Sequence, residues 1–290
     1  MSKNEIFNEI LNKLYNWDEN CAYVGQDFEL DLQGHSSHYD DNASRHLFTI
    51  LNEDLFERPT YKTFIALLDN YTAGTGKDES VDPEEVQENV DFINAITDTN
   101  LMKNFYQDMV DKELFDGDYN AFRRYLYINW FRLYARNYDS NQAGILDSSA
   151  FEHTFVGETK DNSNGEGSPM GFHNWIRMHF LEQSGELDYE GHVRKATRDI
   201  MLMVRFNWNG QDKVSSIFVG TSPEFEIAAY TLALILARKN DEDDNHDAKF
   251  EFEIDGDNYG VQLYCKTKWS NKHNRKKLQL QSAFPTAEFD

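Results

Sequence analysis

The stretch IMLMVRFNWNGQDKVSSIFVG, from Ile200 to Gly220, decides the fold class. Two runs rich in β-branched and aromatic residues flank the polar segment NWNGQDK, which predicts two strands joined as a hairpin. The pair Asn209-Gly210 falls in that segment and favours a tight hairpin turn. The next residues, Thr221 to Glu224, supply hydroxyls, a proline and an acid. They predict the start of a helix over FEIAAYTLALILAR.

The first half of the chain predicts helices instead. Apolar residues recur there at mixed spacings of three and four, and Pro59 and Pro83 stand where helices begin. The predicted helices cover residues 5–17, 60–71, 83–98, 100–114 and 121–136. A helical region over residues 1–140, followed by an α+β region over residues 141–290, indicates an α+β fold, and we expect the two regions to pack as one unit.

The C-terminal part predicts further strands and carries a basic edge. The segments KFEFEID, YGVQLYC and KLQLQSAF have the composition of strands. No acidic residue occurs from Asn258 to Ala287, although the formal net charge of the chain is −23. The negative net charge argues against a protein that binds nucleic acid through the electrostatic field of its whole surface. The basic C-terminal edge is nevertheless suited to receive an anion. A solvated basic hairpin is the alternative reading.

The sequence predicts neither a transmembrane helix nor a signal peptide, because charged residues interrupt every apolar run. Cys21 and Cys265 are isolated in the sequence, as reduced thiols are. We therefore expect a cytoplasmic protein, while a secreted precursor trimmed to this start stays open. The acidic run DEDDNHD, Asp241 to Asp247, lacks the glycine and glutamate of a calcium-binding loop and favours a solvated loop.

Two histidine blocks carry the candidate chemistry, FEHTFVGE at Phe151–Glu158 and GFHNW at Gly171–Trp175. Histidine titrates near pH 6.5, approximately, so one ring can accept a proton while another donates one. His173 precedes the predicted helix NWIRMHFLEQ, whose dipole favours a phosphate and lowers the pKa of a histidine. His153 lies in a run that we expect to be strand-like, with Glu152 on its opposite face.

Together with GTSPEFEIAAYTL, these blocks resemble the signature segments of the EndoU (XendoU-like) family of uridylate-specific endoribonucleases. The segments NWDENCAYVGQDFELDLQG and FERPTYKTFIALLDNY resemble the family's N-terminal helical portion, so the resemblance covers nearly the whole chain. It implies a lyase-type endoribonuclease that cleaves single-stranded RNA at uridines through the 2′-hydroxyl and leaves a 2′,3′-cyclic phosphate. It also implies stimulation by Mn²⁺ or Ca²⁺, for which the sequence identifies no ligands. We expect a monomer.

The resemblance places the family's catalytic residues on this sequence. Its two catalytic histidines match His153 and His173, and its catalytic lysine matches Lys213, just after NWNG. Its supporting carboxylates, on either side of the first histidine, match Glu152 and Glu158.

The family's uracil-binding motif near the C-terminus matches the segment Ser282-Ala283-Phe284-Pro285. Relatives carry a Thr-Ala-Tyr-Pro type of ending whose hydroxyl and ring contact the base. Ser282 and Phe284 keep a hydroxyl and an aromatic face, but the phenol hydrogen bond is lost.

Two other classes of function stay open. A metal-dependent phosphodiesterase would use His153, His173, Glu152 and Glu158 as ligands. A non-catalytic RNA-binding module would depend on the basic C-terminal edge alone. The end groups of the product distinguish a metal-dependent phosphodiesterase from a transesterifying enzyme. Any cleavage of RNA distinguishes both enzymes from a non-catalytic RNA-binding module.

Overall fold

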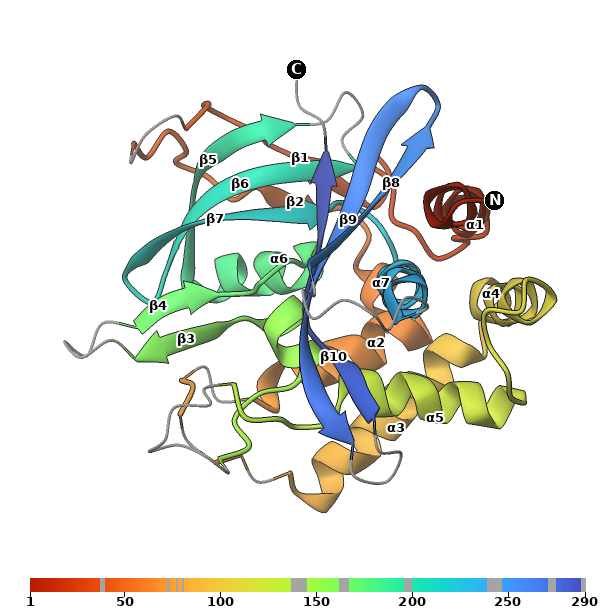
Figure 1. Cartoon of the computed structure of the whole chain (residues 1–290). Helices are drawn as coiled ribbons and strands as arrows, with labels where there is room; N and C mark the ends of the chain where they lie inside the picture. The colour runs from red at the N-terminus through yellow and green to blue at the C-terminus, as the bar shows by residue number, and fades with distance from the viewer. Residues whose placement is uncertain are drawn as a thin grey trace.

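The structure is a computed structural model that describes residues 1–36, 40–71, 74–76, 78–79, 81–136, 145–161, 167–195, 200–238, 247–270 and 275–287. Side chains at 161, 267–270 and 275–277 lie outside that description. Most of the acidic run, residues 241–246, and most side chains of the basic edge therefore fall outside the described residues. The described part combines helices with small antiparallel sheets (Figure 1), which confirms the predicted α+β fold class.

Helices form most of the described first half. They are α1 (Lys3–Asn16), α2 (Pro59–Ala66), α3 (Pro83–Thr97), α4 (Asn100–Asp111) and α5 (Tyr119–Trp130), with α6 (Trp175–Ser184) and α7 (Pro223–Arg238) in the second half and 3₁₀ turns at Glu53–Glu57 and Leu67–Asp69. Side-chain oxygens of Ser2, Asp82, Thr99 and Asp118 accept amide hydrogens in the first turns of α1, α3, α4 and α5. These caps satisfy backbone donors that a helix leaves free.

Three predicted helices end earlier than expected, and the one predicted over 100–114 ends at Asp111. The segment predicted over 60–71 ends its α-helix at Ala66, and the segment predicted over 121–136 ends at Trp130. Beyond Trp130 the chain makes an isolated antiparallel bridge between Tyr134 and Ser148. The tertiary contact replaces the helical hydrogen bonds there and turns the chain toward the second half.

The strands pair in antiparallel fashion and range in length from three to 14 residues. They are β1 (Phe28–Leu30), β2 (Phe48–Ile50), β3 (Glu158–Asp161), β4 (Gly167–Met170), β5 (Leu187–Lys195), β6 (Met201–Trp208), β7 (Gln211–Phe218), β8 (Asp247–Ile254), β9 (Asp257–Ser270) and β10 (Arg275–Ala287). Two sheets have three strands each, in the orders β5-β6-β7 and β10-β9-β8, and β1-β2 and β3-β4 form pairs. The pair β1-β2 was not predicted, because strands of three residues show no usable periodicity.

The predicted hairpin is confirmed as β6-β7. Trp208 pairs with Gln211, and the two turn residues, Asn209 and Gly210, have φ values of 54° and 75°. Positive φ at both positions is the reason that Asn-Gly suits this turn. The following helix, α7, begins as predicted, with the amide of Phe225 donating to the hydroxyl of Ser222 at 3.2 Å.

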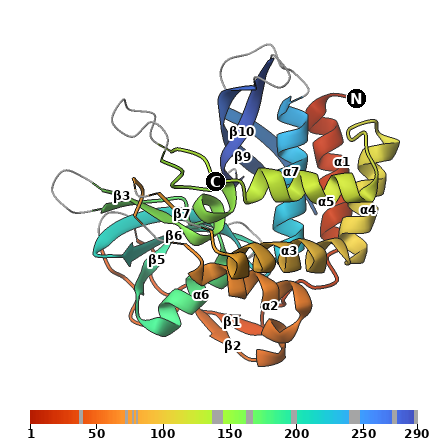
Figure 2. The same cartoon turned by 90° about the horizontal axis from the view of Figure 1, so that it is seen from below.

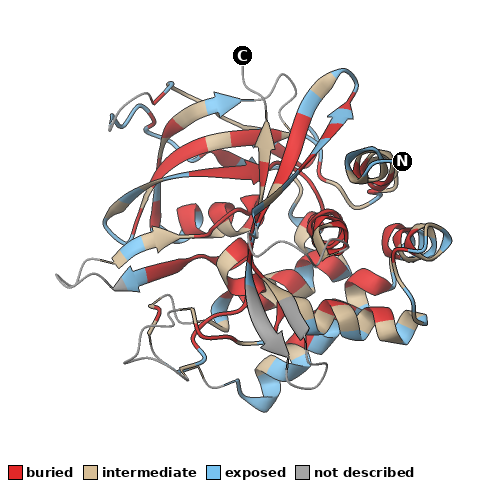
Figure 3. Ribbon diagram, in the orientation of Figure 1, coloured by how far each residue is buried: buried red, intermediate tan, exposed pale blue. Residues whose placement is uncertain are grey.

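A single hydrophobic core runs through both halves of the described chain. Helix α7 is buried around almost its whole circumference and lies between α1 and strands β9 and β10 (Figure 2; Figure 3). Helix α1 packs against β8, where the rings of Phe7 and Phe250 stack at 5.1 Å. The predicted boundary at residue 140 lies outside the described residues. Within the described chain, no helix is long and apolar enough to cross a membrane.

The prediction of an extended run around His153 is wrong. Residues Glu152–Val156 form a short π-type helical turn that ends at Gly157, whose φ is 89°. The aromatic residues of this run resemble a strand in composition, but Phe151 and Phe155 are four apart and pack together on one side, at a ring distance of 5.1 Å. Glu152 is therefore not placed opposite His153 by strand alternation.

Candidate active site

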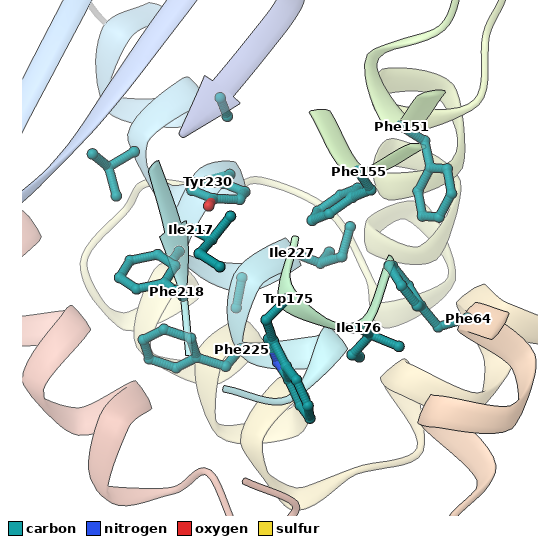
Figure 4. Close-up of a cluster of buried hydrophobic side chains, with 14 of the residues drawn as sticks. Phe64, Phe151, Phe155, Trp175, Ile176, Ile217, Phe218, Phe225, Ile227 and Tyr230 are labelled. Atoms are coloured by element: carbon teal, nitrogen blue, oxygen red, sulfur yellow. The ribbon is translucent and has the colours of Figure 1, made fainter. Parts of the chain in front are cut away.

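His153 lies on the turn Glu152–Val156, which its neighbours fix to the core. Phe151 and Phe155 are fully buried, and the ring of Phe155 packs against Tyr230 of α7 at a centroid distance of 6.1 Å (Figure 4). The side chain of His153 is 11% exposed. A firmly packed turn therefore presents an imidazole that is largely buried but not sealed from solvent.

The main chain brings His173 directly beside this turn. The amide of Phe172 donates to the carbonyl of His153 at 3.0 Å, and the amide of His173 donates to the carbonyl of Thr154 at 2.7 Å. Gly171 permits this approach, because its φ is +63° and a Cβ there would lie 1.7 Å from the carbonyl oxygen of His153. Backbone contacts thus hold the two histidine segments together.

The ring of His173 is held through Nδ1. This atom lies 3.0 Å from the carbonyl oxygen of Ser216 and 2.8 Å from Oγ of Ser215, whose hydroxyl donates to the carbonyl of Phe172 at 2.6 Å. Because both partners accept, this network assigns the proton of the neutral ring to Nδ1 and leaves a lone pair on Nε2. Burial, followed by the charge of Lys213, lowers the pKa of His173 well below its ordinary value. The ring is suited to accept a proton.

The ring of His153 has a different partner, a carboxylate. Its Nδ1 lies 2.5 Å from Oε2 of Glu158, and Nε of Arg136 donates to the same oxygen at 2.8 Å. Burial and then the charge of Arg136 lower the pKa of His153 to about 4, while Glu158 opposes them. Burial acts to raise the pKa of Glu158, but the bond from His153 and the charge of Arg136 leave it lowered. Glu158 is therefore an anion that can stabilise a protonated ring.

Glu152 hydrogen-bonds within its own turn. Its Oε2 accepts from the amide of Ser149 at 3.3 Å, and its own amide donates to Oγ of Ser149 at 3.1 Å. Burial and then the negative charge of Glu158 raise the pKa of Glu152 well above its ordinary value. Of the two predicted supporting carboxylates, the structure places Glu158 against the ring of His153 and Glu152 at the start of the turn that carries His153.

Lys213 reaches the same place from β7. Its Nζ donates to the carbonyl of Pro169 in β4 at 3.4 Å. Burial lowers the pKa of Lys213 to about 8. Its charge in turn contributes to lowering the pKa of both His153 and His173, so the three side chains lie close enough to interact electrostatically. The structure thus brings the three predicted catalytic residues together.

Strand β10 brings the predicted uracil-binding segment to the histidines. The rings of Phe284 and His173 stack with centroids 4.8 Å apart and planes inclined by 23°. The amide of Ala283 donates to Oγ1 of Thr154 at 3.2 Å. A β-bulge precedes Ser282, which is buried in this structure. Ser282 and Phe284 therefore lie on either side of Ala283, whose amide contacts the turn that carries His153.

The described residues offer no evident metal centre. No group of three or more His, Cys, Asp or Glu side chains among them is placed to hold an ion. Several of the atoms that the metal-dependent alternative would use are engaged, because Oε2 of Glu158 is bound by Arg136 and His153, and Nδ1 of His173 is held by serine oxygens. Among the described residues, these side chains do not form the donor set of a metal site.

Three residues of the site were not anticipated from the sequence. Arg136 belonged to a predicted helix, and no motif marks its contact with Glu158. Thr154 follows His153 in the sequence, but no motif marks its contact with β10. Ser215 had a usable signal, because it lies two residues after Lys213 on a predicted strand and must share its face.

Comparison with known proteins identifies relatives across the whole chain. The model of the family described as Endoribonuclease XendoU matches residues 7–285. Uridylate-specific endoribonuclease B of Danio rerio is 36% identical over 269 residues, which cover 88% of this chain and 89% of that protein. Poly(U)-specific endoribonuclease-A of Xenopus laevis is 37% identical over 251 residues, covering 81% and 83%. A solved structure of XendoU, titled as a splicing-independent snoRNA processing endoribonuclease, matches with a TM-score of 0.76 and 32% identity over 97% of this chain and 96% of that one.

Proposed function

This chain belongs to the XendoU family of endoribonucleases, and we propose that it cleaves single-stranded RNA at uridines by transesterification. The observation that best supports the chemistry is the pair of adjacent histidines, each with its Nδ1 engaged by a protein group. Each ring can then offer Nε2 to a substrate. Two such groups are what cleavage through an internal hydroxyl requires, one to remove a proton and one to supply a proton.

The proposed roles follow from the partners of the two rings. His173, neutral and bonded to uncharged oxygens, accepts the proton of the uridine 2′-hydroxyl as its oxygen bonds to phosphorus. His153 has a pKa of about 4, so its proton-donating form is a minor species, which the Glu158 carboxylate stabilises. In that form His153 donates the proton on Nε2 to the 5′-oxygen as the bond between that oxygen and phosphorus breaks. The products are a 2′,3′-cyclic phosphate and a 5′-hydroxyl. Each proton transfer contributes about 10²- to 10⁴-fold to the rate.

Lys213 supplies the positive charge in this proposal. Negative charge accumulates on the non-bridging oxygens as phosphorus becomes five-coordinate, and a fixed ammonium stabilises it more in the transition state than in the ground state. With a pKa of about 8, Lys213 is mostly protonated at neutral pH. Its burial strengthens the interaction, because less water screens it.

Uridine selection is assigned to β10. Ser282 offers a hydroxyl that can exchange hydrogen bonds with uracil, and Phe284 offers an aromatic surface next to His173. The names of the relatives, uridylate-specific and poly(U)-specific, support this choice of base. Glu158 orients His153 directly, and Glu152 supports the turn that carries it.

Stimulation by Mn²⁺ or Ca²⁺ is part of the proposal on the strength of the family resemblance alone. The reaction above proceeds through side chains of this protein, so an ion would act by another route, such as on the RNA. Cleavage measured first with a chelator and then with each ion tests this. An unchanged rate would contradict stimulation without affecting the transesterification proposal.

We also infer that the protein acts in the cytoplasm as a monomer. Cys21 and Cys265 are both free thiols, which suits a reducing compartment. Light scattering of the purified chain tests the oligomeric state, and imaging of the tagged protein in its own cells tests the compartment.

The decisive test of function uses a short RNA with a single uridine. Wild-type protein should cut it and leave a 2′,3′-cyclic phosphate, which mass spectrometry identifies. The same RNA with 2′-deoxyuridine or 2′-O-methyluridine at that position should bind without being cut, because the nucleophile is absent. Cleavage of the modified RNA at the ordinary rate, or a linear monophosphate formed directly, would favour metal-assisted hydrolysis. Binding without any cleavage would favour a non-catalytic RNA-binding module.

A further inference from the structure

Arg136 and His153 both contact the same carboxylate oxygen of Glu158. Nε of Arg136 and Nδ1 of His153 lie 2.8 Å and 2.5 Å from Oε2 of Glu158. The side chain of Arg136 is only 11% exposed and that of Glu158 is fully buried. One carboxylate oxygen in a dry setting therefore faces a permanent cation and a titratable ring at once.

The main chain of Arg136 is fixed from two sides. Its amide donates to Oδ1 of Asp147 at 2.8 Å, and its carbonyl accepts from Nζ of Lys266 at 2.9 Å. Its guanidinium lies 5.7 Å from the ring centre of Tyr134. The position of the charge is thus determined by contacts that do not involve the histidine.

The far end of the guanidinium points to β10. Its two terminal nitrogens make long contacts, of 3.4 Å and 3.5 Å, with the side-chain and main-chain oxygens of Gln281, the residue before Ser282. Arg136 therefore connects the carboxylate behind His153 with the strand to which uridine selection is assigned. A simple surface ion pair would make neither contact.

We propose that Arg136 is a positioning residue that holds Glu158 ionised and aimed at His153, and that limits how tightly His153 keeps its proton. The inference rests on the proposed function, since it concerns the same proton transfer. Without Arg136, the Glu158 carboxylate would face His153 alone, and the pair would bind a proton more strongly. With Arg136, the proton is released more readily to a leaving oxygen.

Whether the loss of Arg136 raises or lowers the pKa of His153 depends on every charged group near His153. Glu158 favours the protonated ring, whereas Arg136 and Lys213 disfavour it. His153 and His173 also interact electrostatically. Besides Glu158, Arg136 interacts electrostatically with Glu152, Tyr134 and Lys266. Removing Arg136 deletes a positive charge and leaves the Glu158 and Lys213 contributions in place. The net change is a stronger hold on the proton of the His153–Glu158 pair.

The test compares Arg136→Gln and Arg136→Lys with wild type. In Arg136→Gln, the imidazole signals of His153, followed by NMR without RNA, should titrate about 1 pH unit or more higher, the usual effect of one nearby charge. The limb of the kcat/KM profile that His153 governs should move in the same direction. Arg136→Lys keeps the charge and should stay close to wild type. Arg123→Gln, which removes an arginine paired with Asp98 on the helices, should change neither readout.

Each outcome decides the inference. Titration of His153 at the wild-type pH in folded Arg136→Gln would overturn it, even if the rate of cleavage fell. If Arg136→Gln does not fold, Glu158→Gln is compared with the double variant Arg136→Gln/Glu158→Gln, and His153 should titrate higher in the double variant. Absence of RNA cleavage by wild-type protein would instead refute the proposed function, while the NMR titration would still report on Arg136.

Discussion

The hydroxyl of Thr154 accepts a hydrogen bond from the backbone amide of Ala283 at 3.2 Å, and both residues are fully buried. Thr154 follows His153 in the chain, and its carbonyl accepts the amide of His173 at 2.7 Å. One small residue, through its main chain and its side chain, therefore joins both histidine segments to the strand that carries Ser282.

Replacing Thr154 by valine should loosen that junction. Valine has nearly the same shape but leaves the buried amide of Ala283 without an acceptor, which costs about 1 to 3 kcal/mol of the free energy of unfolding. We expect a lower Tm and a smaller ratio of kcat/KM between uridine and cytidine substrates. Thr154→Ser keeps the hydroxyl and should retain more of both. Equal base preference in the serine and valine variants would show that the hydrogen bond does not align β10.

The three proposed catalytic residues should behave as one unit. His153→Ala, His173→Ala and Lys213→Ala should each lower the single-turnover cleavage rate by about 10²-fold or more in the folded fraction. Replacing both histidines should cost much less than the product of the single losses, because both serve one transition state. His192→Ala, which removes a histidine bonded to the carbonyl of Leu32, is the matched control. Near-wild-type rates for a histidine variant would remove that residue from the mechanism.

Phe284 should affect both binding and rate. If its ring stacks with a base, Phe284→Ala should weaken binding of a non-cleavable uridine RNA by about 1 to 3 kcal/mol. Because the ring also packs on His173, kcat should fall as well, whereas Ser282→Ala should mainly reduce the preference for uridine over cytidine. Wild-type affinity and preference in both variants would refute the assignment of this segment to base recognition.

Asp18 should make the protein less stable as the pH rises. Burial, followed by the negative charge of Glu224, raises the pKa of Asp18 from 3.8 to about 7. Between those values the folded protein holds a proton that the unfolded chain has lost, so the free energy of unfolding decreases with increasing pH and is lowest above the folded pKa.

Asp18→Asn mimics the protonated form and should raise Tm at pH 8, by roughly 2–4 °C for each 1 kcal/mol gained. It should also flatten the change in Tm between pH 5 and pH 8. Some slope should remain, because the pKa values of Glu182 and Glu190 are also raised to about 7. Glu19→Gln changes the same charge on an exposed neighbour and should leave the slope intact. A full wild-type slope in Asp18→Asn would contradict the assignment.

Local signals explain which parts of this structure were predictable. The β6-β7 hairpin and the start of α7 depend on neighbouring residues, an Asn-Gly turn and a Ser222 cap, and both were predicted correctly. The turn at His153 was not, because its aromatic content suits a strand and only the i, i+4 packing of Phe151 and Phe155 distinguishes it.

The parts of the site that could not be predicted depend on contacts between residues far apart in the sequence. The histidines and Lys213 could be chosen from the family resemblance, but their partners lie far away in the sequence. Arg136 reaches Glu158 across 22 residues. That contact depends on where α5 ends, and the helical periodicity of the sequence continued beyond that point. No spacing rule in the sequence connects the two residues.

The close approach of Gly171 to the carbonyl oxygen of His153 means that some positions of the site tolerate substitution and others do not. Any side chain there would collide with the carbonyl of His153, so the spacing of the two proton-transfer groups is a property of the main chain and tolerates no gradual change. The positions of β10 to which base recognition is proposed, Ser282 and Phe284, carry ordinary side chains and can be exchanged one at a time. On the proposed function, single substitutions on this strand can change which base is preferred, whereas a side chain at position 171 would disturb the reaction at phosphorus for every base.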